Sequence, residues 1–251
     1  MFIGKIRNLE IFCLLIPQTL MHCLIYYNTK MRRYIFKKEK TTTKVDQKFL
    51  NLSLTERVQY AIENSNWLWT YPVIDFIIEN FAIKNILEIG VAYGGHARHL
   101  MNKFKNLRYT GVDPYLPDYD PKDGFSRDVQ RLFPEYSANQ AFDNLHIEVR
   151  KSLEMFQERC ILIRKKSDDF FASNSNLYDC IYIDGDHREL PVINDLRNSW
   201  KCLTPGGTLI GDDIEWIGVK KSVEKFCNEI QKDFFVIMSG KNSGHTFIIK
   251  K

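Results

Sequence analysis

The sequence predicts an α/β fold: a mostly parallel seven-stranded sheet with an antiparallel last strand and helices on both faces. Short apolar runs alternate with helical patterns from residue 85 onward, which is typical of parallel strands joined by crossover helices. Several of these runs end in glycine or aspartate, as strands do at the ligand-binding edge of such a sheet. The 251 residues, 44% hydrophobic and 26% charged, suit one such domain with additions.

The first half of the domain opens with two helices. Ser53 and Glu56 have the spacing of a capping box, so a helix is expected to begin there and run to about residue 65. A second helix is expected to start near Pro72. Strands are predicted at 85–90 and 108–114, on either side of a helix at 95–105.

Residues 115–158 interrupt this alternation. The segment begins with the loop YLPDYDPKDGFS, rich in proline, aspartate and tyrosine, and continues with helical stretches. A long insertion beside a strand end is often a lid or a substrate wall, and that role is expected here.

The second half resumes the alternation and closes with an antiparallel pair. An amphipathic helix follows the strand YDCIYI and is expected to stop at Pro205-Gly206-Gly207. The predicted strands are 159–167, 178–183 and 208–214, with a short helix after the first and a helix at 219–231 after the last; FFVIMSG and HTFIIKK form the closing pair.

Residues 1–45 are predicted to be an extension outside the domain, which then occupies residues 46–251. Residues 11–27 are apolar but are interrupted by Pro17 and several polar residues, whereas a membrane span needs about 20 apolar residues. The first 60 residues contain no alanine, so a cleaved signal with a small-residue site is not expected. A cytoplasmic protein is favoured; a weak membrane anchor at 11–27 and translation from Met31 stay open.

Charge and cysteine content argue against a dedicated nucleic-acid-binding protein and against a metal site built from cysteines. The net charge is +4, and much of the excess lies in a basic cluster between residues 30 and 40, so no dedicated nucleic-acid surface is expected. The six cysteines have no CxxC or other metal-ligand spacing. They are expected to be buried free thiols, which favours a reducing compartment.

The segment LEIGVAYGGHA, residues 87–97, is the first candidate binding element. A strand ends at Gly90, the chain turns through Gly94 and Gly95, and a helix begins, so main-chain N–H groups can face a closely approaching ligand. The spacing differs from the dinucleotide fingerprint GxGxxG, which disfavours NAD. A tight turn that needs glycine only for its geometry is the alternative.

Asp113 ends the next strand and suits a ribose. An acidic side chain there accepts hydrogen bonds from both ribose hydroxyls. An Asp-Pro pair also favours a solvated turn, but the glycine loop one strand earlier favours the binding interpretation. Together they indicate a nucleoside-containing cofactor across the strand ends.

Acidic residues follow two further strands. Asp184 ends one strand, and Asp212 and Asp213 end the next, so the three carboxylates are expected to converge at one edge. Carboxylates packed together repel one another unless a cation is present, and oxygen ligands suit Mg²⁺, Mn²⁺ or Ca²⁺. The alternative is that Asp212 or Asp213 caps the next helix.

His187 lies three residues after Asp184 and is a candidate general base, because its ordinary pKa is near neutrality. An exposed loop histidine is the alternative, and Asp186 is left without a role. His96 and His99, on the helix after the glycines, are expected to be surface or supporting groups.

Assembled, these residues resemble the class I S-adenosylmethionine-dependent methyltransferases. The resemblance is to the small-molecule O-methyltransferase-like branch with an IDGDH motif, the methyltransferase domain 24 type, and it covers roughly residues 80–250. It is carried by NILEIGVAYGGHARHL, YTGVDPY and YDCIYIDGDHRELPVINDLRNSWKCLTPGGTLIGDDI. It implies a Rossmann-like fold, a cofactor loop at Glu88, Gly90 and Gly94, ribose binding by Asp113, adenine contacts at Ser167 and Asp168, and metal ligands Asp184, Asp212 and Asp213.

The predicted function is therefore O-methylation of a small-molecule hydroxyl by S-adenosylmethionine, with a divalent cation, preferably Mg²⁺, and with Asp184 and His187 as catalytic residues. In catechol O-methyltransferase a lysine stands where this chain has His187, so the base departs from that pattern. The alternatives are a metal-independent methyltransferase, a nucleotide-binding oxidoreductase and a non-catalytic nucleotide-binding protein.

Overall fold

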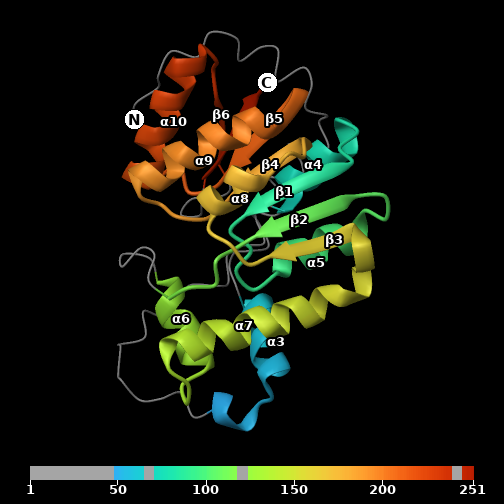
Figure 1. Cartoon of the computed structure of the whole chain (residues 1–251), viewed down its shortest axis with the longest axis vertical. Coiled ribbons are helices and arrows are strands. Elements are labelled where there is room, and N and C mark those ends of the chain that lie inside the picture. Colours follow the sequence, from blue (N-terminus) through green and yellow to red (C-terminus); the bar gives the residue numbers. More distant parts are fainter. Residues whose placement is uncertain (1–47, 65–70, 118–123, 239–244) are drawn as a thin grey trace. The chain divides into compact units, whose positions relative to one another are not determined.

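The structure is a computed structural model that describes residues 48–64, 71–117, 124–238 and 245–251 (Figure 1). The chain divides into a unit at 1–43 and a unit at 44–251, and all described residues belong to the second. The predicted extension and its apolar segment 11–27 lie outside the described residues. Within the described ranges, no helix is both long enough and apolar enough to cross a membrane.

Seven strands of the described chain form one sheet in the order β3-β2-β1-β4-β5-β7-β6. Strands β1 to β5 pair in parallel, and β7 runs antiparallel to both β5 and β6. This confirms the predicted fold class. The strands are β1 (Asn85–Ile89), β2 (Arg108–Val112), β3 (Cys160–Ile163), β4 (Tyr178–Ile183), β5 (Leu203–Gly211), β6 (Phe235–Met238) and β7 (His245–Lys250).

Helices cover both faces of the sheet, because neighbouring residues of the central strands enter different cores. Ile86 packs on one face with residues of α4, α5 and α7, whereas Leu87 packs on the other with residues of α8, α9 and α10. The helices are η1 (Phe49–Asn51), α3 (Leu54–Asn64), α4 (Tyr71–Asn80), α5 (Gly95–Lys103), α6 (Phe125–Leu132), α7 (Ala138–Leu153), η3 (Glu154–Arg159), α8 (Ser167–Ser173), α9 (Glu189–Cys202) and α10 (Ile217–Ile230).

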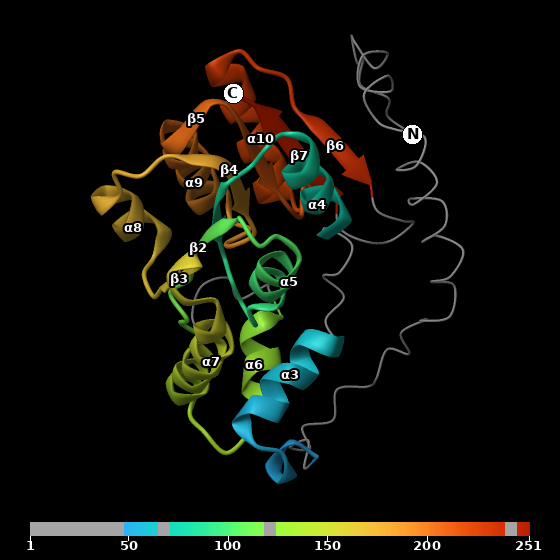
Figure 2. The ribbon, with the colours of Figure 1, turned by 90° about the vertical axis from the view of Figure 1, so that its right-hand side faces the viewer.

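The insertion after β2 forms α6, α7 and η3, and α3 packs with α6 and α7 in one group (Figure 2). The capping box predicted at Ser53 is present: its N–H donates to Oε2 of Glu56 over 2.7 Å, and the N–H of Glu56 donates to Oγ of Ser53 over 3.3 Å. A second capping box joins Ser137 and Gln140 at the start of α7. Side-chain caps therefore fix where both helices begin.

Strands β1 and β2 end one and two residues before their predicted ends, and the boundaries of β3 and β5 differ more. β3 is shorter than the predicted 159–167, and β5 begins at Leu203 and ends at Gly211 instead of covering 208–214. The segment Pro205-Gly206-Gly207, expected only to stop the helix, lies within β5, where the register with β4 is irregular. Asp212 and Asp213 consequently lie beyond the strand and not in it.

Candidate active site

Four strand ends meet at one level of the sheet. The register pairs Ile89 with both Val112 and Ile183, and Ile183 with Gly211. The residues that follow these four positions are Gly90, Asp113, Asp184 and Asp212. The sheet order reverses between β1 and β4, and open α/β sheets bind ligands at such a point, beyond the carboxyl ends of the strands.

The turn after β1 passes directly over the end of β4. Gly90 has a φ of 91°, and a Cβ at this position would lie 2.0 Å from the carbonyl oxygen of Asp184. Gly94 is the N-cap of α5, with a φ of 72°. Gly90 therefore serves the close main-chain contact and Gly94 the left-handed N-cap, and the loop presents the first turn of α5 at the edge of the sheet.

Asp113 is buried and holds the glycine loop. Its Oδ2 accepts hydrogen bonds from the N–H groups of Val91 and Ala92 over 2.9 and 3.0 Å, and its Oδ1 accepts one from Tyr115 over 2.7 Å. Burial raises the pKa of Asp113, and these three donors oppose that shift. The solvated-turn alternative is thus wrong for Asp113, while its predicted contact with a ribose stays a prediction.

Glu88 lies in the interior, one strand residue before the loop. Its carboxylate accepts a hydrogen bond from the Tyr109 hydroxyl and lies 3.1 Å from Nδ1 of His96. Both partners are buried, and the ring of His96 stacks on Tyr71. His96 is therefore a supporting group beneath the glycine loop. The sequence signal for it was a histidine in the first turn of the helix that follows the glycines.

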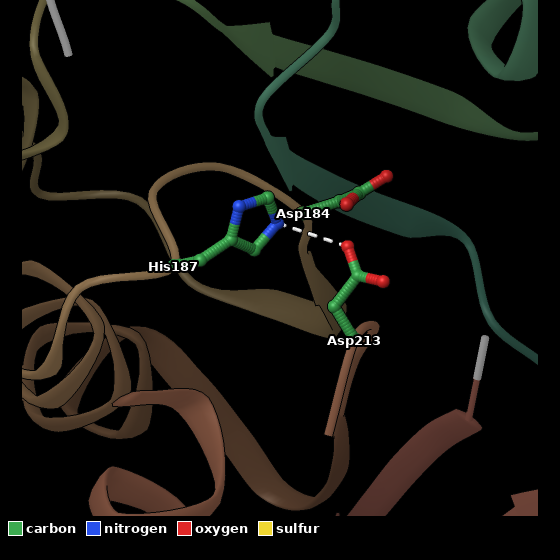
Figure 3. Close-up of side chains that lie close together, drawn as sticks. All are labelled: Asp184, His187 and Asp213. Carbon is green, nitrogen blue, oxygen red and sulfur yellow. Dashed lines mark hydrogen bonds and ion pairs between the residues drawn. The ribbon is translucent and has the colours of Figure 1, made fainter. Parts of the chain in front are cut away.

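Asp184, His187 and Asp213 converge beyond β4 and β5 (Figure 3). One ligand atom from each side chain lies within 4.8 Å of the other two. Nε2 of His187 is 2.9 Å from Oδ2 of Asp213, and the His187 ring stacks on Trp216 with centroids 4.6 Å apart. Two carboxylates and an imidazole thus meet at the edge of the sheet where the glycine loop begins.

Asp212 lies beside this group but has different partners. Its Oδ1 accepts from the Thr246 hydroxyl over 3.3 Å, and the Tyr182 hydroxyl lies 3.4 Å from its Oδ2 and 3.3 Å from Oδ2 of Asp184. Burial, followed by the charge of Asp213, raises the pKa of Asp212 to about 7. The N-cap of α10 is Trp216, so neither Asp212 nor Asp213 caps that helix. The alternative that one of them does is therefore wrong.

Burial also raises the pKa of Asp184 well above its usual range, and the charges of Asp212 and Asp213 add to this effect. Clustered carboxylates of this kind favour either a shared proton or a bound cation.

Asp186, for which the sequence predicted no role, binds the guanidinium of Arg188. It also accepts a hydrogen bond from the main-chain N–H of Arg188 over 2.8 Å.

The residues predicted to contact adenine follow β3. Ser167 and Asp168 form the start of α8, beside Asp195 of α9. Asp195 is buried, with 3% of its surface exposed, and burial raises its pKa to about 7 while a hydrogen bond from Ser167 opposes the shift. The contact between Ser167 and Asp195 is not predictable from the sequence, because it joins two helices through tertiary packing.

Known proteins share this fold and this sequence pattern. The model of a family described as "Methyltransferase domain" matches residues 87–214, which span β1 to the end of the acidic segment. An uncharacterised protein, R132, of Acanthamoeba polyphaga mimivirus is 36% identical over 72 residues, covering 29% of this chain and 31% of that protein.

Two solved structures illustrate the likeness in fold. A candidate caffeoyl-CoA O-methyltransferase from Staphylococcus aureus gives a TM-score of 0.51 at 17% identity, covering 82% of this chain and 95% of that one. The O-methyltransferase TomG from Streptomyces achromogenes, solved with S-adenosylmethionine, gives 0.50 at 11% identity, covering 91% and 96%.

The fold is that of the class I methyltransferases. This chain belongs to the methyltransferase-domain family. The oxidoreductase alternative is therefore wrong.

Proposed function

We propose that the chain methylates a hydroxyl oxygen of a small molecule with the help of a divalent cation. The observation that carries this proposal is the convergence of Asp184, His187 and Asp213 at the edge where the glycine loop begins. The S. aureus and Streptomyces proteins are named as O-methyltransferases, and their similarity in fold to this chain supports the proposal.

The cofactor is placed across the ends of β1, β2 and β3. Gly90 and Gly94 let S-adenosylmethionine approach the main chain, and Asp113 keeps one acceptor position for a ribose hydroxyl after its three internal hydrogen bonds. Ser167 and Asp168 stand on the adenine side, at the start of α8. Glu88 contributes from below, because its carboxylate fixes His96 in the first turn of α5.

The acidic group fits a divalent cation by the chemistry of its donors. Asp184 and Asp213 supply carboxylate oxygens close to each other, and burial makes the negative charge of Asp184 unfavourable without a counter-charge. When bound, such a cation lowers the pKa of an acceptor hydroxyl and orients it. Mg²⁺ suits the oxygen donors. Asp212, the third predicted ligand, supports Asp184 through the hydroxyl of Tyr182.

His187 is the proposed general base. Asp213 lies 2.9 Å from its Nε2 and Trp216 stacks on its ring, so the imidazole is held in one orientation at the acid group. The proton released when the acceptor oxygen takes the methyl group passes to this imidazole. In-line alignment of the oxygen with the methyl sulfonium supplies most of the remaining rate, since the sulfonium is already a strong electrophile.

One observation keeps a metal-independent methyltransferase as the second candidate. His187, Tyr182 and Thr246 already provide hydrogen bonds to the acidic side chains, so these carboxylates have partners in the protein itself. In that case Asp184 and Asp213 would bind hydroxyls of the acceptor directly.

The test is transfer of a labelled methyl group from S-adenosylmethionine to a metabolite extract, with Mg²⁺ and with a chelator. We expect activity that the chelator abolishes and Mg²⁺ restores, and a loss of at least about 100-fold in His187→Gln. The exposed Asp233→Asn is the control and is expected to match wild type. Wild-type activity that survives the chelator, together with a loss in Asp184→Asn and Asp213→Asn, would overturn the cation and leave the metal-independent enzyme.

A further inference from the structure

Tyr115 is completely buried at the first position of the insertion, yet its main chain is left-handed. Its φ is 47°, a region that residues with a Cβ rarely occupy, and 0% of its surface is exposed. The conformation is held from three directions: its N–H donates to Asp113, its carbonyl accepts from Nη2 of Arg164 over 3.1 Å, and its hydroxyl donates to the carbonyl of Ala92 over 3.2 Å. Such an over-determined outlier often marks a functional position.

Ala92 is the other half of this arrangement. It lies in the middle of the glycine loop, also has a left-handed main chain, with a φ of 49°, and donates its N–H to Oδ2 of Asp113. Both main-chain polar groups of Ala92 are therefore bound by side chains that follow β2: the N–H by Asp113 and the carbonyl by Tyr115. Neither contact is visible in the sequence of the loop itself.

We propose that Tyr115 is a positioning residue for the cofactor: its hydroxyl fixes the carbonyl of Ala92 and so holds the glycine loop in the shape that receives S-adenosylmethionine. The inference rests on the placement of the cofactor at this loop. Asp113 binds the loop through the N–H groups of Val91 and Ala92, and the N–H of Gly94 closes a turn on the carbonyl of Val91 over 2.9 Å. Neither contact binds the carbonyl of Ala92, so the central peptide of the turn keeps the freedom to flip. The Tyr115 hydroxyl removes that freedom, so less order remains to be imposed on binding.

The same residue connects the loop to the insertion. The ring of Tyr115 contacts His146 of α7, with centroids 5.0 Å apart, and Arg164, which binds the Tyr115 carbonyl, also pairs with Asp143 of α7 at 2.5 Å. Tyr115 is thus anchored on both sides, and its hydroxyl stays at a fixed position beneath the loop.

Tyr115→Phe removes only the hydroxyl and tests the proposal. A typical net hydrogen bond corresponds to about a five-fold change in an equilibrium constant, so we expect the variant to bind S-adenosylhomocysteine about five-fold more weakly by calorimetry. Its KM for S-adenosylmethionine should rise by a similar factor, while kcat at saturating cofactor stays near wild type.

Tyr178→Phe is the matched control. Tyr178 is also a buried tyrosine with a hydrogen-bonded hydroxyl, 3.4 Å from the Asn174 side chain, but it lies at the opposite end of β4. It is expected to bind S-adenosylhomocysteine as wild type does. If Tyr115→Phe lowers the melting temperature and leaves the affinity unchanged, the residue is merely structural and the proposal is wrong.

A second substitution tests the partner. Glycine at position 92 keeps the carbonyl that the Tyr115 hydroxyl binds but loosens the main chain of the loop, so in an Ala92→Gly background Tyr115→Phe should weaken binding by at least the same factor of about five. No loss in that background would mean that the hydroxyl does not act by ordering the loop. Wild-type protein that fails to bind S-adenosylhomocysteine at all would instead overturn the cofactor placement, and with it the role of Tyr115.

Discussion

Gly90 and Asp184 meet main chain to main chain where β1 and β4 end, so close that a single methyl group does not fit between them. The turn that is proposed to receive the cofactor and the first residue of the acidic group are therefore parts of one packed unit. A side chain added at Gly90 would therefore displace the main chain of Asp184.

Gly90→Ala is expected to be severely destabilising. The new Cβ would lie under 3.0 Å from the carbonyl oxygen and carbon of Asp184 and from the Cα of Gly185, and a φ of 91° is strained for alanine. A loss of about 3 kcal/mol or more in the free energy of unfolding follows from clash and strain together. Urea denaturation measures the loss, and calorimetry with S-adenosylhomocysteine should show no binding.

Gly206→Ala separates clash from strain. Gly206 has a φ of 76°, but nothing lies within 4 Å of a Cβ built there. Only the strain remains, so we expect a loss of about 1 kcal/mol with cofactor affinity intact. Equal losses at the two glycines would contradict the contact between Gly90 and Asp184.

Stability is expected to fall between about pH 4 and pH 7 because of Asp195. Burial raises the pKa of its carboxyl from 3.8 to about 7 in the folded chain. In this pH window the unfolded chain has lost a proton that the folded chain keeps, so the unfolded state gains relative stability as pH rises, by up to about 1.4 kcal/mol per pH unit. Below the window the full stability is present, and above it the loss is complete.

Asp195→Asn removes the contribution of Asp195 to this dependence, because an amide does not titrate. The difference in unfolding free energy between variant and wild type should therefore grow in favour of the variant from pH 4.5 to pH 8, as measured by urea denaturation. Asp169→Asn, an exposed aspartate on α8, serves as the control and should follow wild type at every pH. Parallel curves for Asp195→Asn and wild type would show that the carboxyl is ionised in the folded chain throughout.

Metal binding should distinguish the three strand-end aspartates. Asp184→Asn and Asp213→Asn each remove a proposed ligand and are expected to abolish binding of Mn²⁺, which is used here as a substitute for Mg²⁺. Calorimetry measures this binding. Asp212→Asn disturbs only the support of Asp184 through Tyr182, so a loss of roughly 10-fold is expected. Complete loss in Asp212→Asn as well would make Asp212 a ligand, as the sequence had predicted.

Tyr109→Phe is expected to lower the free energy of unfolding by about 1–3 kcal/mol, because it leaves one oxygen of the buried Glu88 carboxylate without its donor. In a Glu88→Gln background the charge is gone, and the same substitution should cost less. Thermal or urea unfolding of the four proteins of this cycle checks the coupling. A cost that is independent of residue 88 would mean that the two side chains do not share a hydrogen bond.

Much of the fold is legible in the sequence because each strand is a short apolar run with an obvious end. The alternation of strands and helices, the closing antiparallel pair and the capping box at Ser53 all depend on local chemistry, and all are present. The capping box at Ser137 and Gln140 was equally local and was overlooked. The start of β5 was not predictable, because the proline and glycines that precede it read as a helix stop.

The residues of the site could be predicted from the sequence, but which of them contact one another could not. That Asp213 and not Asp212 reaches His187 depends on the left-handed main chain of Asp213, with a φ of 60°. Which of two adjacent aspartates faces a neighbour is decided by such a turn and cannot be read from spacing. The partners of Glu88 and Asp195 come from other elements and likewise require the packed fold.

The pairing of β1 with β4 also affects the order in which parts of the site form during synthesis and folding. Ile86 pairs with Cys180, so the two central strands join only after the long insertion between them has been synthesised and the chain has closed on itself. A nascent chain that ends before β4 has the glycine loop without the packing partner of Gly90. Competence to hold the methyl donor should therefore arise late in folding, together with the acidic group, and the two functions of the edge should appear as a single event.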